Sequence, residues 1–238
     1  LHVRIPRWME AHLADFPDTL FLQSIRHPIQ SVGSRLRHFN VFAEMFPSLA
    51  VDSMSAGLNN GRPWPPENRS RWRGVRLEDL HNSPSQTMRR VCDWLQLDWH
   101  DSLLESTFNG LLWWNWPKTP RVNGFNKGIV SRNYDEYIPK FDLFRMNVLF
   151  ARKCEAWGYP VAGWHRSLIA KLLVLLSLAI PLRMEFKSMS SMKAASPPGR
   201  SALVRMLLTL KMYVDGRLML LKAWLRSFRK YDDEVEVL

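Results

Sequence analysis

Arg26, Pro28 and Ser34 have the residue types and the spacing of a phosphate-binding turn. Apolar residues within 21–25 predict a buried strand that ends at Arg26, and Pro28 predicts a helix start because its missing N–H costs nothing in a first turn. Ser34 then lies about one and a half turns into that helix. A guanidinium at a strand end, beside a helix N-terminus and a hydroxyl, suits a phosphate monoester. A surface arginine that closes an ordinary strand–helix unit is the alternative interpretation.

This motif resembles the 3′-phosphate-binding motif of the sulfotransferases that use 3′-phosphoadenosine-5′-phosphosulfate (PAPS). The matching positions are Arg26, Pro28, Ser34 and Phe39. The resemblance implies that Arg26 and Ser34 hold the 3′-phosphate of the nucleotide. It is extended by four more segments that are similar to the same family in the same order, namely residues 3–18, 75–99, 124–138 and 150–160.

Two of these segments add candidate binding residues. Arg4 stands where the family usually has a lysine, and the resemblance implies that it neutralises the phosphosulfate. Asn126, Lys127 and Gly128 take the places of the Arg-Lys-Gly loop that closes over the 3′-phosphate, which leaves Lys127 as the remaining cation. The implied reaction transfers a sulfuryl group from PAPS to a hydroxyl or amine of a small-molecule, glycan or lipid acceptor.

One family feature is absent from the sequence. The Gly- and Ser/Thr-rich loop that cradles the 5′-phosphosulfate has no counterpart in the chain, and in the family it precedes the segment where this sequence starts. We therefore expect a C-terminal part of a sulfotransferase that holds half of the site. The catalytic base is not identifiable, since neither His2 nor Arg4 is a convincing candidate.

The element pattern predicts an α/β fold with a P-loop-like parallel sheet that is flanked by helices and incomplete at its N-terminal side. Residues 40–70 have many turn formers and are interpreted as an excursion, either part of an acceptor pocket or an ordinary surface loop. The expected strands are residues 19–26 and 72–77, and the expected helices are residues 7–14, 28–38, 84–95 and 141–157.

Charge divides the chain into two regions. The net charge is +11, and residues 164–231 hold thirteen Lys and Arg against Glu185 and Asp215. We expect a sulfotransferase-like domain over residues 1–163 and a basic helical extension over residues 164–238. In that extension, residues 167–182 predict an apolar helix too short to span a bilayer, and residues 201–231 a long amphipathic one.

The long C-terminal helix has two interpretations. It packs on the domain or on its partner helix, or it binds an anionic membrane surface, which makes the chain a non-catalytic remnant that binds membranes or a protein partner. Arg217 interrupts its apolar side. Nucleic-acid binding is disfavoured because the aromatic residues line up on the apolar face and do not interleave with the cations.

The remaining residue types carry little chemistry. Cys92 and Cys154 lie in apolar helical stretches and are interpreted as buried reduced thiols, with a disulfide as the disfavoured alternative. Reduced cysteines together with basic helices fit a cytoplasmic or membrane-peripheral location. No Cys and His cluster has metal-ligand spacing, so we expect no metal. Trp113, Trp114 and Trp116 are favoured as core residues over a stacking platform for an adenine or sugar.

Overall fold

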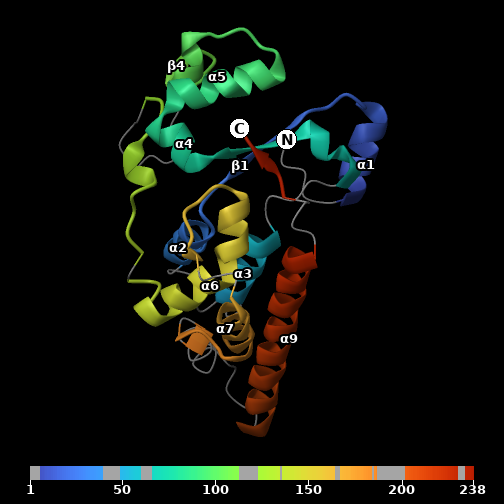
Figure 1. Ribbon diagram of the computed structural model, residues 1–238, viewed down its shortest axis with the longest axis vertical. Coiled ribbons are helices and arrows are strands. Elements are labelled where there is room, and N and C mark those ends of the chain that lie inside the picture. The colour runs from blue at the N-terminus through green and yellow to red at the C-terminus, as the bar shows by residue number, and fades with distance from the viewer. Residues whose placement is uncertain are drawn as a thin grey trace. The chain divides into compact units, whose positions relative to one another are not determined.

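The computed structural model of the chain describes residues 6–39, 49–59, 66–112, 123–134, 136–163, 167–183, 185–186, 202–229 and 234–238 (Figure 1). Arg4 and the three clustered tryptophans after Leu112 lie outside these residues. The sheet, the helices and the loop that carries Lys127 lie within the described residues.

A parallel sheet of three strands confirms the α/β fold class. β1 (Phe21–Ile25) pairs with β2 (Trp72–Arg76), and β2 pairs with β5 (Glu236–Val237), so the strand order is β1-β2-β5. Phe21 stands opposite Trp72, and their rings stack with centroids 4.5 Å apart. β5 is a strand that the sequence analysis did not predict. The described residues also form a separate antiparallel hairpin, β3 (Thr107–Phe108) with β4 (Leu111–Leu112).

Most helices lie close to their expected bounds. α5 begins at Pro84, the favoured first-turn position of proline, and ends at Leu95, followed by Gln96 in the left-handed conformation of a helix cap. The helices are α1 (Pro6–Asp15), α2 (Pro28–Phe39), α3 (Leu49–Asn59), α4 (Leu77–Asn82), α5 (Pro84–Leu95), α6 (Lys140–Ala156), α7 (Leu168–Ala179) and α9 (Ala202–Arg229). Short 3-10 turns are η2 (Pro66–Arg71), η3 (Asp101–Leu104) and η4 (Lys127–Ile129).

α3 corrects the interpretation of residues 40–70 as an irregular excursion. Ala50, Met54 and Leu58 recur every four residues and are almost fully buried, which is the pattern of a helix that turns one face to a core. α4 was missed as well, because residue 77 was expected to end the strand and instead begins a short helix.

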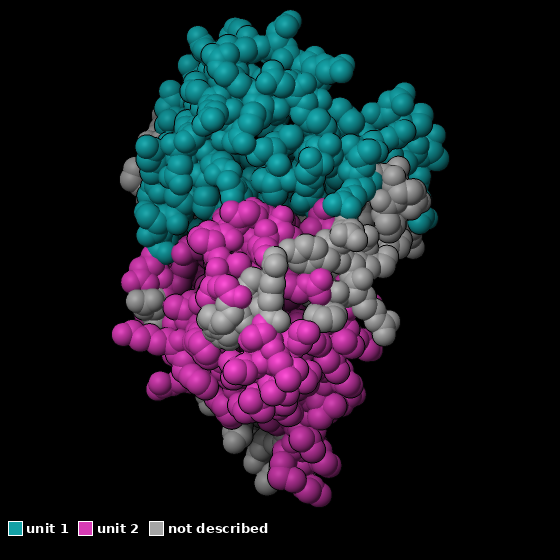
Figure 2. Space-filling model, in the orientation of Figure 1, with its two compact units in different colours: residues 1–26, 61–132, 235–238 teal, residues 27–60, 133–234 magenta. Residues whose placement is uncertain are grey.

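The chain forms two compact units, which Figure 2 colours separately. The first comprises residues 1–26, 61–132 and 235–238 and contains the sheet. The second comprises residues 27–60 and 133–234 and is helical. Residues on both sides of position 163 belong to the second unit, and the expected domain division at that position stays a prediction.

Close helix packing in the second unit depends on small residues. A Cβ atom at Gly57 of α3 would lie 3.1 Å from the Phe150 ring of α6, which is fully buried. Gly216 of α9 faces Val51 of α3, with 3.4 Å between that side chain and an ideal Cβ. Each fully buried large apolar side chain contributes roughly 1.5–3 kcal/mol to folding, so these contacts are a major stabilising feature of the unit.

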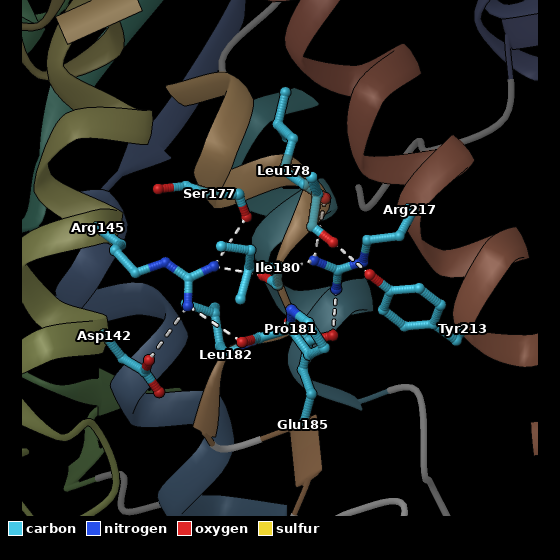
Figure 3. Close-up of polar contacts among 11 residues, drawn as sticks. Asp142, Arg145, Ser177, Leu178, Ile180, Pro181, Leu182, Glu185, Tyr213 and Arg217 are labelled. Atoms are coloured by element: carbon cyan, nitrogen blue, oxygen red, sulfur yellow. Dashed lines mark hydrogen bonds and ion pairs between the residues drawn. The ribbon is translucent and has the colours of Figure 1, made fainter. Parts of the chain in front are cut away.

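Arg145 of α6 anchors the C-terminal end of α7 (Figure 3). Its guanidinium donates to the carbonyls of Ser177 and Pro181, each at 3.1 Å. It also donates to the carbonyl of Ile180. Asp142, one turn earlier on α6, lies 3.7 Å away as an ion-pair partner. Burial is the largest cause that lowers the pKa of Arg145, and the carboxylates of Asp142 and Glu185 oppose it. A guanidinium keeps its proton in proteins, so the charged fork satisfies carbonyls that the helix leaves unpaired.

Arg217 of α9 approaches the same turn from the other side (Figure 3). It forms an ion pair with Glu185 and donates to the carbonyl of Leu178 at 3.3 Å. The Glu185 carboxylate in turn accepts from the backbone N–H of Leu182 at 2.9 Å. This explains why a cation interrupts the apolar side of the helix: Arg217 has a buried partner.

Candidate functional site

Arg26 joins the end of β1 to the loop that carries Lys127. It follows the last residue of β1, and its Nη2 donates to the backbone carbonyl of Ile129 at 3.0 Å. Ile129 is the last residue of η4, the turn that begins at Lys127. The carboxyl ends of parallel strands are where α/β proteins bind ligands. Arg26 and Lys127, two of the cations expected at a phosphate, therefore belong to one local arrangement in the first unit.

The loop from Asn123 to Ile129 is fixed at its start by two backbone-directed contacts. Gly124 has φ +76°, and a Cβ atom there would lie 2.3 Å from the carbonyl oxygen of Leu104, so glycine is required. Ser106 Oγ donates to the carbonyl of Gly124 at 3.1 Å. The start of the loop is therefore held against Leu104, the last residue of η3.

The middle of the loop is fixed by His81 and Asn126. The backbone N–H of Asn126 donates to Nδ1 of His81 at 2.8 Å. The side-chain oxygen of Asn126 accepts from the N–H of Gly128 at 2.8 Å and so caps η4. Lys127 and Gly128 are exposed between these anchors. Hydrogen bonds fix the loop backbone on both sides of the exposed cation Lys127, and such an arrangement suits an anionic ligand.

His81 is a residue that the sequence analysis missed. It lies at the end of α4, directly after Leu77-Glu78-Asp79-Leu80, and its ring meets the Phe125 ring edge-on with centroids 5.7 Å apart. Burial and the positive charge of Arg26 lower the pKa of His81, and the charge of Glu78 opposes them. The signal in the sequence was a histidine next to a family-like strand–helix junction.

Ser34 lies in the second unit, on α2, and is partly buried. The preceding residue, Gly33, packs under Tyr134, since an ideal Cβ on Gly33 would lie 2.5 Å from Cγ of that ring. Tyr134 itself is buried, with its ring against α2. Arg26 and Ser34 belong to different units, so their joint role stays a prediction.

Comparison with known proteins found one matching family. Residues 6–101 match the model of the sulfotransferase family. The match supports the sulfotransferase family recognised from the sequence over this segment, and the use of PAPS is consistent with it. The matched segment contains Arg26 and Ser34 and ends before the loop that carries Lys127. No curated protein and no solved structure matches the chain significantly.

Two further findings concern metals and membranes. Within the described ranges, no group of three or more His, Cys, Asp and Glu side chains is arranged to hold a metal ion. None of the helices in the described part of the chain is both long and apolar enough to cross a membrane. Cys92 and Cys154 are buried free thiols, as expected.

Proposed function

We propose that the protein transfers a sulfuryl group from PAPS to a hydroxyl or amine of an acceptor. Arg26, Ser34 and Lys127 hold the 3′-phosphate in this proposal, Gly128 gives the loop its close backbone, and Arg4 neutralises the phosphosulfate. The observation that carries it is the hydrogen bond from Arg26 to Ile129, because it brings the loop of Lys127 to the end of β1. The family match over residues 6–101 supports the reaction class.

The reaction is an in-line displacement at sulfur. An acceptor oxygen or nitrogen forms a bond to sulfur while the bond from sulfur to the 5′-phosphate oxygen breaks, and 3′-phosphoadenosine 5′-phosphate leaves. The acceptor proton passes to a base that is not among the residues assigned here. The cations hold the nucleotide and stabilise charge on the leaving phosphate, so their contribution is positioning and electrostatic stabilisation. The acceptor is a small molecule, a glycan or a lipid.

Calorimetry with two nucleotides tests the phosphate site. The wild-type protein should bind 3′-phosphoadenosine 5′-phosphate more tightly than 5′-AMP, which lacks the 3′-phosphate. Arg26→Ala should remove about 2–4 kcal/mol of that binding and leave 5′-AMP nearly unchanged, because a charge-assisted fork contact is lost. Arg26→Lys should restore only part of it.

Controls separate the site from general charge. Lys127→Ala changes an exposed side chain. It should weaken the binding of 3′-phosphoadenosine 5′-phosphate without changing the midpoint of thermal unfolding. Arg90→Ala removes an exposed cation from α5 and should leave both affinities unchanged. If the wild type binds 3′-phosphoadenosine 5′-phosphate and 5′-AMP equally well, the protein has no site for the 3′-phosphate and the proposal is wrong.

A second function is supported by the surface of α7 and α9. Both helices expose many large apolar side chains, although buried contacts remain on their other sides. On α9 exposed cations alternate with them: Lys211 follows Leu207 by four residues, and Lys222 follows Leu218 by four, so each pair shares a face. The exposed large apolar residues are Leu168, Ile169, Leu172, Leu175 and Leu176 of α7, and Leu203, Val204, Met206, Leu207, Leu208, Leu210, Val214, Leu218, Met219 and Leu225 of α9.

We infer that this surface binds an anionic lipid surface, because exposed leucines interleaved with lysines match the layers of a charged membrane interface. The chain then acts as a membrane-peripheral protein, for which a cytoplasmic location is expected. The full chain should co-sediment with vesicles of phosphatidylcholine and phosphatidylserine and not with phosphatidylcholine alone. Lys211→Glu with Lys222→Glu should abolish this, and Arg90→Glu should not. Equal binding to both vesicles, or dimerisation that buries the leucines, contradicts the proposal.

A further inference from the structure

We propose that His81 is a positioning residue for the nucleotide: it holds the loop of Lys127 in its binding conformation through Nδ1 and releases the loop when the ring takes up a proton. The inference rests on the proposed 3′-phosphate site and adds to it a residue that the family match and the sequence resemblance do not assign. His81, the loop of Lys127 and Arg26 all lie in the first unit.

The first step is the protonation state of the ring. The N–H of Asn126 points at Nδ1 of His81 at 2.8 Å, and a ring nitrogen accepts a hydrogen bond only when it carries no proton. The ring is therefore neutral, with its proton on Nε2. A proton added at Nδ1 turns the acceptor into a donor that faces another donor, and the contact with Asn126 is lost.

Asn126 links His81 to the part of the loop that contains Lys127 and Gly128. Asn126 uses its backbone N–H toward His81 and its side-chain oxygen toward the N–H of Gly128, at 2.8 Å in both cases. Lys127 lies between Asn126 and Gly128 in the chain, so its backbone moves with theirs. A shift of Asn126 therefore displaces both the cation and the glycine that the proposed function places at the phosphate.

The third step is the charge around the ring. Arg26, which binds the other end of the loop at Ile129, opposes protonation of His81, while Glu78 on the same short helix favours it. Asp79 forms an ion pair with Arg76 at 2.6 Å, and Lys127 is exposed. The balance lowers the pKa of His81, with burial as the largest cause. The loop is consequently held at neutral pH and loosened in acid.

Two substitutions separate the hydrogen bond from the titration. In His81→Asn the side-chain oxygen takes the place of Nδ1 and accepts from Asn126 at every pH. His81→Leu removes the acceptor altogether. Calorimetry with 3′-phosphoadenosine 5′-phosphate between pH 8 and pH 5.5 should show wild-type affinity falling more steeply in acid than that of His81→Asn. Phosphate groups of the nucleotide titrate equally in all variants, so the difference between the two profiles reports the ring. His81→Leu should bind about tenfold more weakly than wild type at pH 8.

Amide hydrogen exchange of residues 125–129 is the second measurement, made without nucleotide on the same variants. Protection of Asn126 and Gly128 should be lost in acid for the wild type and kept for His81→Asn. Superimposable pH profiles of wild type and His81→Asn, in binding or in exchange, overturn the proposal. If the wild type binds no nucleotide at any pH, the proposed function fails, and the exchange data alone decide whether His81 holds the loop.

Discussion

The ammonium nitrogen of Lys153 lies 3.1 Å from a carboxylate oxygen of Glu234, and neither side chain is more than 7% exposed. Lys153 also lies over the Trp157 ring, 4.6 Å from its centroid. Lys153→Met should lower the free energy of unfolding by about 3–5 kcal/mol, because Glu234 is left as a buried charge without its cation. Urea denaturation measures the change.

The double variant Lys153→Met with Glu234→Leu serves as the control for this pair. The double variant should recover most of the lost free energy of unfolding, because both buried charges of the pair are removed together. Glu236→Gln is a matched exposed case: its carboxylate pairs with Arg73 at 3.3 Å but is 66% exposed, and the cost should be about 1 kcal/mol or less. A single Lys153→Met effect as small as that of Glu236→Gln would show that the buried pair contributes nothing special.

Gly33→Ala should destabilise the second unit by about 1–3 kcal/mol, because the added Cβ would lie 2.5 Å from the Tyr134 ring. Thermal denaturation by circular dichroism measures the effect. Tyr134→Leu in the same chain should relieve part of the clash. Gly163→Ala is the matched control, since a Cβ there meets nothing within 4 Å and stability should be unchanged or slightly raised.

Arg145→Met should lower stability by about 2–4 kcal/mol, because the carbonyls of Ser177, Ile180 and Pro181 lose their shared donor and Asp142 stays buried. Arg145→Lys should have only slightly higher stability than Arg145→Met, because an ammonium group does not reach three carbonyls as a planar guanidinium does. Chemical denaturation of both variants checks this. Full recovery by lysine would mean that charge alone, and not the fork, stabilises the turn.

Stability should fall in acid through His81. Burial and Arg26 lower the pKa of His81 in the folded state below its ordinary value of 6.5, so the unfolded chain takes up the proton first. The contribution is fully present above about pH 6.5, decreases as the pH falls through that value, and stops changing below the folded pKa. Urea denaturation from pH 8 to pH 5 should show a steeper loss for wild type than for His81→Asn. A steeper loss in His81→Asn would reverse the assigned sign.

The β1–Arg26–α2 junction could be predicted from the sequence because its signals are local. Proline at the first turn, an apolar strand and the periodicity of the helix all agree with the final structure. α5 was predicted at its observed bounds for the same reason, with Pro84 at its start.

Other parts depend on distant residues and could not be predicted locally. β5 has two residues within an acidic stretch, and only the edge of β2 makes it a strand. α3 was obscured by the serines and the glycine within it, although Ala50, Met54 and Leu58 show its period. The hydrogen bond between His81 and Asn126 joins residues 45 positions apart in the chain, so the sequence shows a histidine after a strand–helix junction but not the loop that it contacts.

Pairing of Arg73 with Glu236 and of Gly74 with Val237 has a consequence for biosynthesis. On the ribosome, β2 emerges long before β5 is translated, so the nascent sheet waits with one edge of β2 unfilled. Such an edge is a template for other chains, and long-range parallel pairing is slow to form. Overexpressed protein should therefore aggregate mainly during synthesis, and a lower expression level, which reduces the concentration of unfinished chains, should increase the soluble fraction.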